Sequence, residues 1–153
     1  MKKKFVFMIV LAAFLSFAYI GQSAKDIPVS KIEKSMSKCL KEQKLKKCMD
    51  RDLMHFMEID PSSIDGYFYY KSSEALSVEE LLVIKVKSHN NLNEFRDSIE
   101  KRISNQHKTF ESYGPKQVSQ LDNALIIQKG TYLLYYVGDD IQKIEEVFRN
   151  AIQ

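Results

Sequence analysis

Strand and helix patterns follow one another in a repeated order after residue 60, and this order leaves few arrangements for the fold. Residues 67–71 and 81–87 are rich in aromatic or β-branched residues, as strands are. A helical pattern follows from residue 91, then a hairpin pattern over residues 124–137 and a last helix. Strand–strand–helix, taken twice, predicts one antiparallel sheet of about four strands.

We therefore expect an α+β fold with helices on one face of the sheet. In residues 81–87, Leu82 and Ile84 alternate with Lys85 and Lys87, which predicts a strand with one face in water. The hairpin is expected to turn at Lys129-Gly130. Caps are expected for two helices, at Asn91 for the long one and at Asp139 for the last one.

Residues 25–60 carry a different, helical pattern. Ser30 and Glu33 have the spacing of a capping box, which predicts a helix from Ser30 to about Glu42. A second short helix is expected over residues 50–57, and Pro61 and Gly66 break the chain after it. We expect the helical segment 25–60 to pack with the α+β core, residues 61–153, as one domain.

The stretch "ESYGPKQVSQLDNA", residues 111–124, resembles a binding loop at first sight. Gly114 follows the long helix where a left-handed cap residue is expected, and Pro115 suits the first turn of a new helix. The structural interpretation is a helix end, a sharp turn and one or two helical turns. The functional alternative is a site that uses Tyr113, Lys116 or Asp122.

The first 24 residues have the layout of a secretory signal peptide. Three lysines precede an apolar run of 16 residues, Phe5 to Ile20, and small residues follow at Gly21 and Ser23. Cleavage after Ser23 is the favoured prediction, and an uncleaved N-terminal anchor is the alternative. The protein is therefore expected outside the cytoplasm, secreted or in the cell envelope, with membrane contact only through this segment.

The charge pattern gives no reason to expect a nucleic-acid partner. Lys2, Lys3 and Lys4 supply the whole formal charge of +3, and the chain from Lys25 onward carries 20 basic and 20 acidic residues. Nucleic-acid binding depends on neutralising phosphates. One basic run at residues 41–47 is interpreted as a solvated loop or helix end.

Cys39 and Cys48 are the only cysteines. Outside the cytoplasm two cysteines are compatible with a disulfide, provided that a helix ends between them. The alternative is that both are small buried apolar groups, since Cys39 shares a helical stripe with Ile32 and Met36. Both interpretations stay open at this point.

Chemistry-bearing motifs are scarce. The three histidines, His55, His89 and His107, lie in separate segments, which predicts no metal site. No nucleophile elbow surrounds a serine, and the five glycines of the chain include no phosphate-binding loop. Glu79-Glu80 and Asp139-Asp140 are interpreted as residues that precede a strand and cap a helix. No cofactor is predicted.

Tyrosines are frequent in the predicted strands. An exposed aromatic face is a binding surface for a protein, a peptide or a glycan, and Tyr67, Tyr69 and Tyr132 are the candidate residues. The alternative is that tyrosines simply suit strands and direct their hydroxyls to water.

Residues 50–152 resemble a bacterial domain-of-unknown-function family, number 4358, which occurs in small exported or lipid-anchored proteins. The resemblance is carried by the strand before the long helix, by "ESYGPKQVSQLDNA" and by "KGTYLLYYVGDD". It implies an envelope location and no particular activity. This chain departs from the lipid-anchored pattern, since no cysteine lies near the cleavage region.

The sequence thus predicts a non-enzymatic extracytoplasmic binding or accessory module. The first alternative is an envelope hydrolase with a site near the 113–123 turn. The second is a membrane-tethered structural protein.

Overall fold

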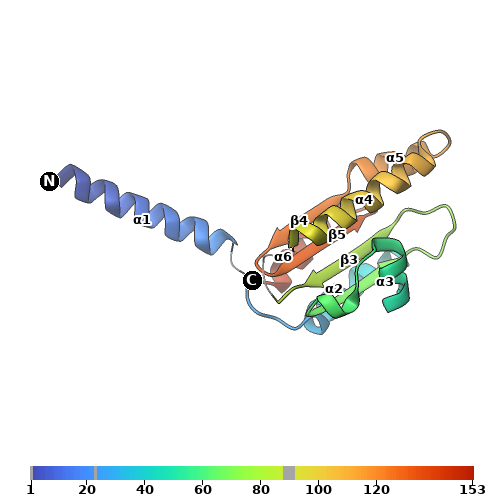
Figure 1. Cartoon of the computed structure of the whole chain (residues 1–153), viewed down its shortest axis with the longest axis horizontal. Coiled ribbons are helices and arrows are strands. Elements are labelled where there is room, and N and C mark those ends of the chain that lie inside the picture. The colour runs from blue at the N-terminus through green and yellow to red at the C-terminus, as the bar shows by residue number, and fades with distance from the viewer. Residues whose placement is uncertain (1, 23, 88–91) are drawn as a thin grey trace.

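A five-stranded antiparallel sheet organises the computed structural model of the chain, which describes residues 2–22, 24–87 and 92–153 (Figure 1). The strand order is β1–β2–β3–β5–β4. The strands are β1 (Lys46–Lys47), β2 (Gly66–Lys71), β3 (Glu80–Lys85), β4 (Leu125–Lys129) and β5 (Tyr132–Val137). The helices are α1 (Lys2–Gln22), α2 (Val29–Glu42), α3 (Asp50–Met57), α4 (Leu92–Phe110), α5 (Pro115–Asp122) and α6 (Ile141–Ala151), with a 3-10 turn at Pro61–Ser63.

The predicted α+β class and the antiparallel sheet are confirmed, with one strand more than expected. The extra strand, β1, has only two residues, and Lys46 and Lys47 pair with Lys71 and Tyr70 of β2. Two lysines carry no strand pattern, so their role is set by the neighbouring edge of β2. The predicted cap at Asn91 and the residue His89 lie outside the described residues.

Helices cover both faces of the sheet, which corrects the prediction of one covered face. On one side α2 and α6 pack on Leu81 and Val83 of β3. On the other side α3, α4 and α5 pack on Leu82 and Ile84. Apolar residues thus occupy successive positions of β3, and β5 is buried along its whole length. The predicted wet face is wrong because alternating lysines begin only at the end of the strand.

The capping residues predicted for the helix ends differ from those in the structure. The helix α2 begins at Val29 after Pro28, and no side chain caps it. The predicted capping box is therefore absent, and Glu33 instead accepts a hydrogen bond from Tyr70 (2.7 Å). The N-cap of α6 is Asp140 rather than Asp139, and its side chain makes no capping bond.

The 111–124 stretch forms the predicted turn and short helix, α5. Pro115 is its first residue, as expected. Gly114, however, has a φ of −119°, so it is not a left-handed cap. Glycine is required for space, since a Cβ atom at this position would lie 2.8 Å from Cδ1 of Phe110. The stretch therefore serves close packing between the end of α4 and the start of α5.

A short segment, residues 24–28, joins α1 to the folded part, and we call it the strap. The Tyr132 hydroxyl accepts from the Ile27 amide (2.6 Å) and donates to the Ile27 carbonyl (2.7 Å). The Lys25 amide donates to the Ile152 carbonyl (3.1 Å), and Asp26 pairs with Lys85 (2.6 Å). The strap is therefore a part of the domain and not a free linker.

The helix α1 extends away from the sheet and its covering helices (Figure 1). Exposed apolar side chains occupy much of its length, with 44–69 % of each exposed. They are Val6, Phe7, Met8, Ile9, Val10, Leu11, Phe14 and Leu15. Within the described residues, no helix combines the length and the apolar character that a membrane crossing needs.

Candidate functional site

The tyrosines predicted to form an exposed face are largely core residues. Tyr69 and Tyr132 have no exposed area, and Tyr67 is half-buried with its hydroxyl directed to Asp50. The prediction of an exposed tyrosine face is therefore wrong for Tyr69 and Tyr132, because helices and the strap cover both sides of the sheet. Along β5 the tyrosines alternate between the two faces, since Tyr132 and Tyr136 face one cluster and Tyr135 the other.

Two other predicted residues, Tyr113 and Lys116, lie at the surface. Tyr113 is 59 % exposed and rests with its ring 5.4 Å from that of Phe110. The amide of Gln117 donates to the carbonyl of Leu76 (2.9 Å), which holds the loop after β2 against the start of α5. Leu76 is itself 64 % exposed. This contact brings together residues that are far apart in sequence.

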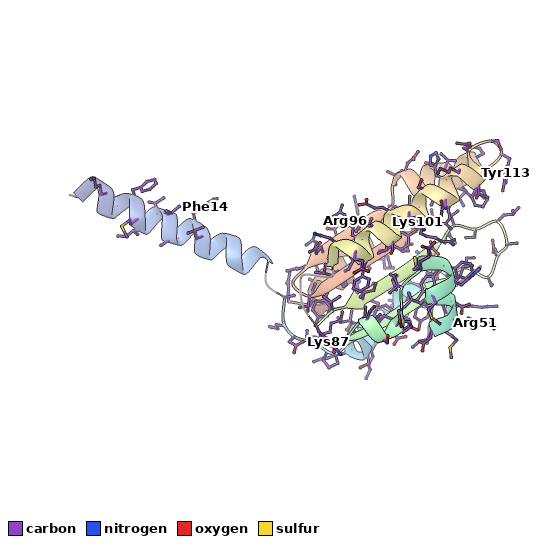
Figure 2. All side chains as sticks on the ribbon, viewed as in Figure 1. Phe14, Arg51, Lys87, Arg96, Lys101 and Tyr113 are labelled. Atoms are coloured by element: carbon purple, nitrogen blue, oxygen red, sulfur yellow. The ribbon has the colours of Figure 1, made fainter. Side chains whose placement is uncertain are left out.

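We call Leu76, Tyr113 and Lys116 the distal surface. Figure 2 shows Tyr113 at the end of the molecule opposite to Phe14 of α1. Large exposed apolar side chains are few in the described residues outside α1, and the others are Met49 and Met54 near the start of α3. Of these three residues, Tyr113 is of the type enriched at the centre of protein interfaces, because aromatic side chains are over-represented there.

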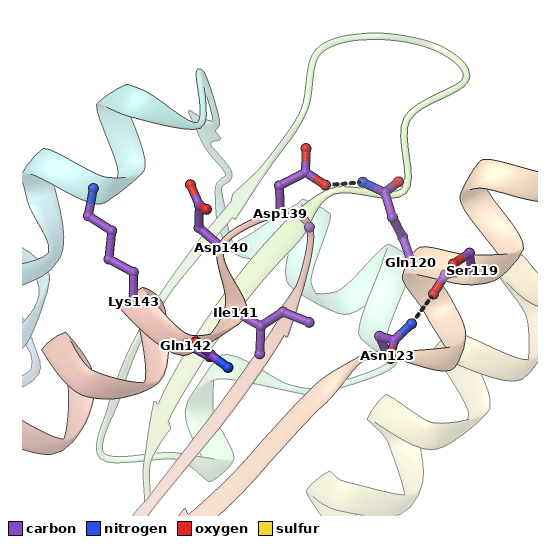
Figure 3. A pocket seen from close by; sticks show the side chains of 9 residues that line it. Ser119, Gln120, Asn123, Asp139, Asp140, Ile141, Gln142 and Lys143 are labelled. Carbon is purple, nitrogen blue, oxygen red and sulfur yellow. Dashed lines mark hydrogen bonds between the residues drawn. The ribbon is translucent and has the colours of Figure 1, made fainter.

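A pocket of about 460 Å³ lies between the second half of α5 and the turn from β5 to α6 (Figure 3). Gln120 donates to Asp139 across it (3.2 Å), and Asn123 donates to the Ser119 carbonyl (2.8 Å). The sequence predicted a site near this place, but through other residues. The lining consists of Ser119, Gln120, Asn123, Gly138, Asp139, Asp140, Ile141, Gln142 and Lys143.

The turn beside the pocket has a left-handed backbone at one residue and leaves no room for a side chain at another. Asp140 has a φ of +58°, and Gly138 lies so close to Tyr136 that a Cβ atom would be 2.8 Å from Cζ of the ring. The Tyr136 hydroxyl donates to the Asp139 carbonyl (2.5 Å). Lys143, at the pocket rim, is paired with Glu42 (2.6 Å). Five of the polar side chains that line the pocket, Gln120, Asn123, Asp139, Asp140 and Lys143, thus have partners in the pocket wall or at the end of α2.

A buried carboxylate, Glu80, is the centre of a polar network that sequence reasoning missed. Its side chain is 1 % exposed. It accepts hydrogen bonds from the hydroxyls of Tyr69 (2.7 Å) and Tyr135 (2.9 Å) and from Nε of Arg102 (3.1 Å). With its amide nitrogen facing Glu80, Gln106 donates a further bond (3.1 Å) and accepts one from Arg102 (3.0 Å).

The electrostatics of this network keep the two phenols neutral and the guanidinium charged. Burial and the Glu80 charge raise the pKa of both Tyr69 and Tyr135, so both phenols stay neutral. Burial of Arg102 opposes its charge, but attraction by Glu80 outweighs this and raises the pKa of the guanidinium. The ring of Phe56 covers that guanidinium at 5.0 Å. The arrangement is closed and satisfied, as in a structural element rather than a reaction centre.

Glu80 gave a signal that pattern reading could have used. It opens β3, where it pairs with Lys71 and Val137, and strands on both sides of it are apolar. An acid inside a buried strand requires cationic or hydroxyl partners. The sequence interpretation instead placed Glu79-Glu80 before the strand, in water.

The two cysteines are free, buried thiols, so of the two open interpretations the buried apolar groups are found and the disulfide between Cys39 and Cys48 is absent. Cys39 belongs to the cluster under α2 and α6, whereas Cys48 belongs to the cluster under α3 and α4. The sheet therefore separates them. Burial, and after it the nearby Asp52, raises the pKa of the Cys48 thiol to about 11.

Metal-ligating residues do not gather in the parts of the chain that the structure describes. His107 lies 3.3 Å from Asp122 at the surface, and His55 packs edge-on against Phe56. The pairing of His107 with Asp122 bridges α4 and α5 beside the turn that the sequence singled out.

Comparison with known proteins places the chain in a family without assigning a reaction to it. No curated protein and no solved structure matches the sequence. A family model described as "Domain of unknown function (DUF4358)" matches residues 38–138, from the middle of α2 to the turn after β5. This match covers most of the sheet, the Glu80 network and the distal surface. The chain therefore belongs to the DUF4358 family.

Proposed function

We propose that this chain is an exported bacterial protein of the cell envelope whose folded part is a non-enzymatic binding or accessory module. The proposed binding surface is the distal surface, with Tyr113 as its central contact. The observation that carries the proposal is that two large exposed side chains, Tyr113 and Leu76, lie in segments that the Gln117 bond to the Leu76 carbonyl connects. Aromatic side chains of this kind dominate the energy of protein interfaces.

The export half of the proposal is supported by α1 and the strap. A lysine-led helix with exposed apolar side chains precedes the domain, and the ordered contacts of the domain begin at once with Lys25 and Ile27. A cleavable export signal must end before the first residue that the fold needs, because the mature chain has to keep every residue that contacts the domain.

Intact mass of the protein recovered from its native cells tests export. A chain that starts near Ala24 in the envelope or medium is the expected result. A full-length chain in the membrane fraction would favour the tethered alternative, and a full-length chain in the cytoplasm would contradict the proposal.

Photo-crosslinking from position 113 in native cells tests binding. We expect a benzoylphenylalanine at Tyr113 to capture one discrete partner, and we expect Leu76→Ser to reduce the capture at least about tenfold, as loss of a central contact does. Met49→Ser is the matched control, since Met49 is as highly exposed (70 %, against 64 % for Leu76) but is the N-cap residue of α3. An equal loss of capture in Met49→Ser, or unchanged capture in Leu76→Ser, would contradict a specific surface.

A further inference from the structure

The two edges of the sheet are protected very differently. One edge is β1, which has two residues, both of them exposed lysines. The other edge is β4, which has five residues, LIIQK, with its single charge at the last position. Shortness and lysines are the usual devices that keep a strand edge from pairing with another chain. This protein applies both devices to β1 and neither to most of β4.

The free edge of β4 carries hydrogen-bonding groups from two residues. Lys129 and Tyr132 flank a two-residue turn in which Gly130 has a φ of +58°. Such a turn makes the flanking pair a hydrogen-bonded one, and such pairs alternate along the ladder. Ile127 therefore directs its amide and carbonyl to β5, whereas Ile126 and Gln128 direct theirs outward. Among the described residues no other backbone group bonds to Ile126 or Gln128.

We infer that β4 pairs antiparallel with β4 of a second copy of this chain. Pairing about a two-fold axis at Ile127 places Ile126 opposite Gln128 of the second copy, and the outward amides and carbonyls of both chains are then satisfied. The two five-stranded sheets become one continuous sheet. This interface is separate from the distal surface and does not depend on it.

Charge favours a second copy as the occupant. In this register Lys129 lies opposite Leu125 of the other copy, so the two lysines are at opposite ends of the interface. The chain from Lys25 onward has equal numbers of basic and acidic residues, 20 of each, so two copies have no net repulsion. Leu125 and Ile126, which are half-buried in one copy, gain cover from the second.

Thiol crosslinking of the full-length chain in its native cells tests the pairing. In the inferred register two Gln128 side chains are diagonal neighbours on one face, about 7–8 Å apart. We expect Gln128→Cys, treated with a short bismaleimide, to give a species of twice the chain mass. Ser37→Cys on the exposed side of α2 is the matched control and should not crosslink. Cys39 and Cys48 are buried, so the unchanged chain supplies the background.

A charge exchange then tests the register. Leu125→Lys places a lysine opposite Lys129 of the second copy and should lower the crosslinking yield of Gln128→Cys at least about tenfold. Adding Lys129→Glu should restore the yield, because the opposed charges become attractive. Restoration also shows that Leu125→Lys is compatible with folding. An absent double-mass species, an equal yield from Ser37→Cys, a crosslink to a different protein, or no response to the charge exchange would each overturn the inference.

Discussion

At the scale of single residues, Glu80 is the side chain on which the most contacts converge. Hydroxyls from β2 and β5 and a guanidinium from α4 all reach its carboxylate, so one residue joins three elements to β3. Removing one member of a buried ion pair leaves the other member charged and without a partner.

We expect Glu80→Ala to lower the free energy of unfolding by about 3–5 kcal/mol, because Arg102 then keeps a buried charge. Urea denaturation measures the loss. Glu79→Ala is the control, since the neighbouring Glu79 side chain is more exposed and accepts only long hydrogen bonds of 3.4 Å. The double variant Glu80→Ala, Arg102→Met should lose less than the sum of the two single variants. Equal losses at positions 79 and 80 would contradict the assigned role.

Cys48 gives a second prediction at this scale. Its pKa of about 11 lies above the ordinary value of 9.0, so the folded protein favours the neutral thiol. The stabilisation is fully present below the ordinary pKa and is lost as the pH rises through about 11. At pH 8, iodoacetamide should therefore alkylate Cys48 far more slowly in the native protein than in urea, as measured by mass spectrometry. Equal rates in both states would show that the thiol is accessible.

At the scale of secondary structure, periodicity predicted most elements well. The short helix over residues 50–57 is α3 with those bounds, and the hairpin is β4 and β5. Such signals are local, so one sequence suffices. The strand β1 and the covering of both faces are not local properties. Lys46 and Lys47 form a strand only because the edge of β2 is free to pair with them. The face of the sheet with Leu81 and Val83 is covered because α2 and α6 pack on it.

The turn at Gly114 was predicted correctly, but the glycine is needed for space and not for a left-handed backbone. This difference can be tested. The φ of −119° at Gly114 suits any residue, so Gly114→Ala should destabilise by overpacking alone, by about 1–3 kcal/mol. Removing the obstructing ring with Phe110→Ala should then recover part of the loss. Gly130→Ala, at a φ of +58°, should show no such recovery in the same background. Thermal denaturation of the four variants distinguishes strain of the backbone from lack of space.

The candidate site was also predictable only in part, because sequence patterns are local and do not show which elements pack together. Exposure of Tyr113 followed from its place in a turn, which the sequence shows. Exposure of Tyr69 and Tyr132 depends on which elements pack over the sheet, and strand patterns do not contain that information. The bond from Gln117 to the Leu76 carbonyl joins residues 41 positions apart and brings the loop after β2 to the start of α5, which no spacing rule would suggest.

At the scale of the whole molecule, the strap connects α1 to the middle of the sheet. We expect Tyr132→Phe to cost about 1–3 kcal/mol, since the Ile27 amide loses its buried partner. Hydrogen exchange of the Ile27 amide should accelerate by a larger factor than the decrease in the free energy of global unfolding accounts for. Tyr70→Phe is the control, because that hydroxyl bonds to Glu33 and not to the strap. Unchanged exchange at Ile27 would mean that the Lys25–Ile152 bond holds the strap by itself.

The strap also decides how the domain responds to mechanical load. Its contacts reach β5, an interior strand between β3 and β4, and the last turn of the chain at Ile152. The C-terminus and the end of α1 accordingly lie close together (Figure 1). A force applied through α1 therefore enters the sheet at its interior and is shared at once with the opposite end of the chain. A membrane or translocation machine that pulls on this segment would strain the centre of the domain before it peels an edge.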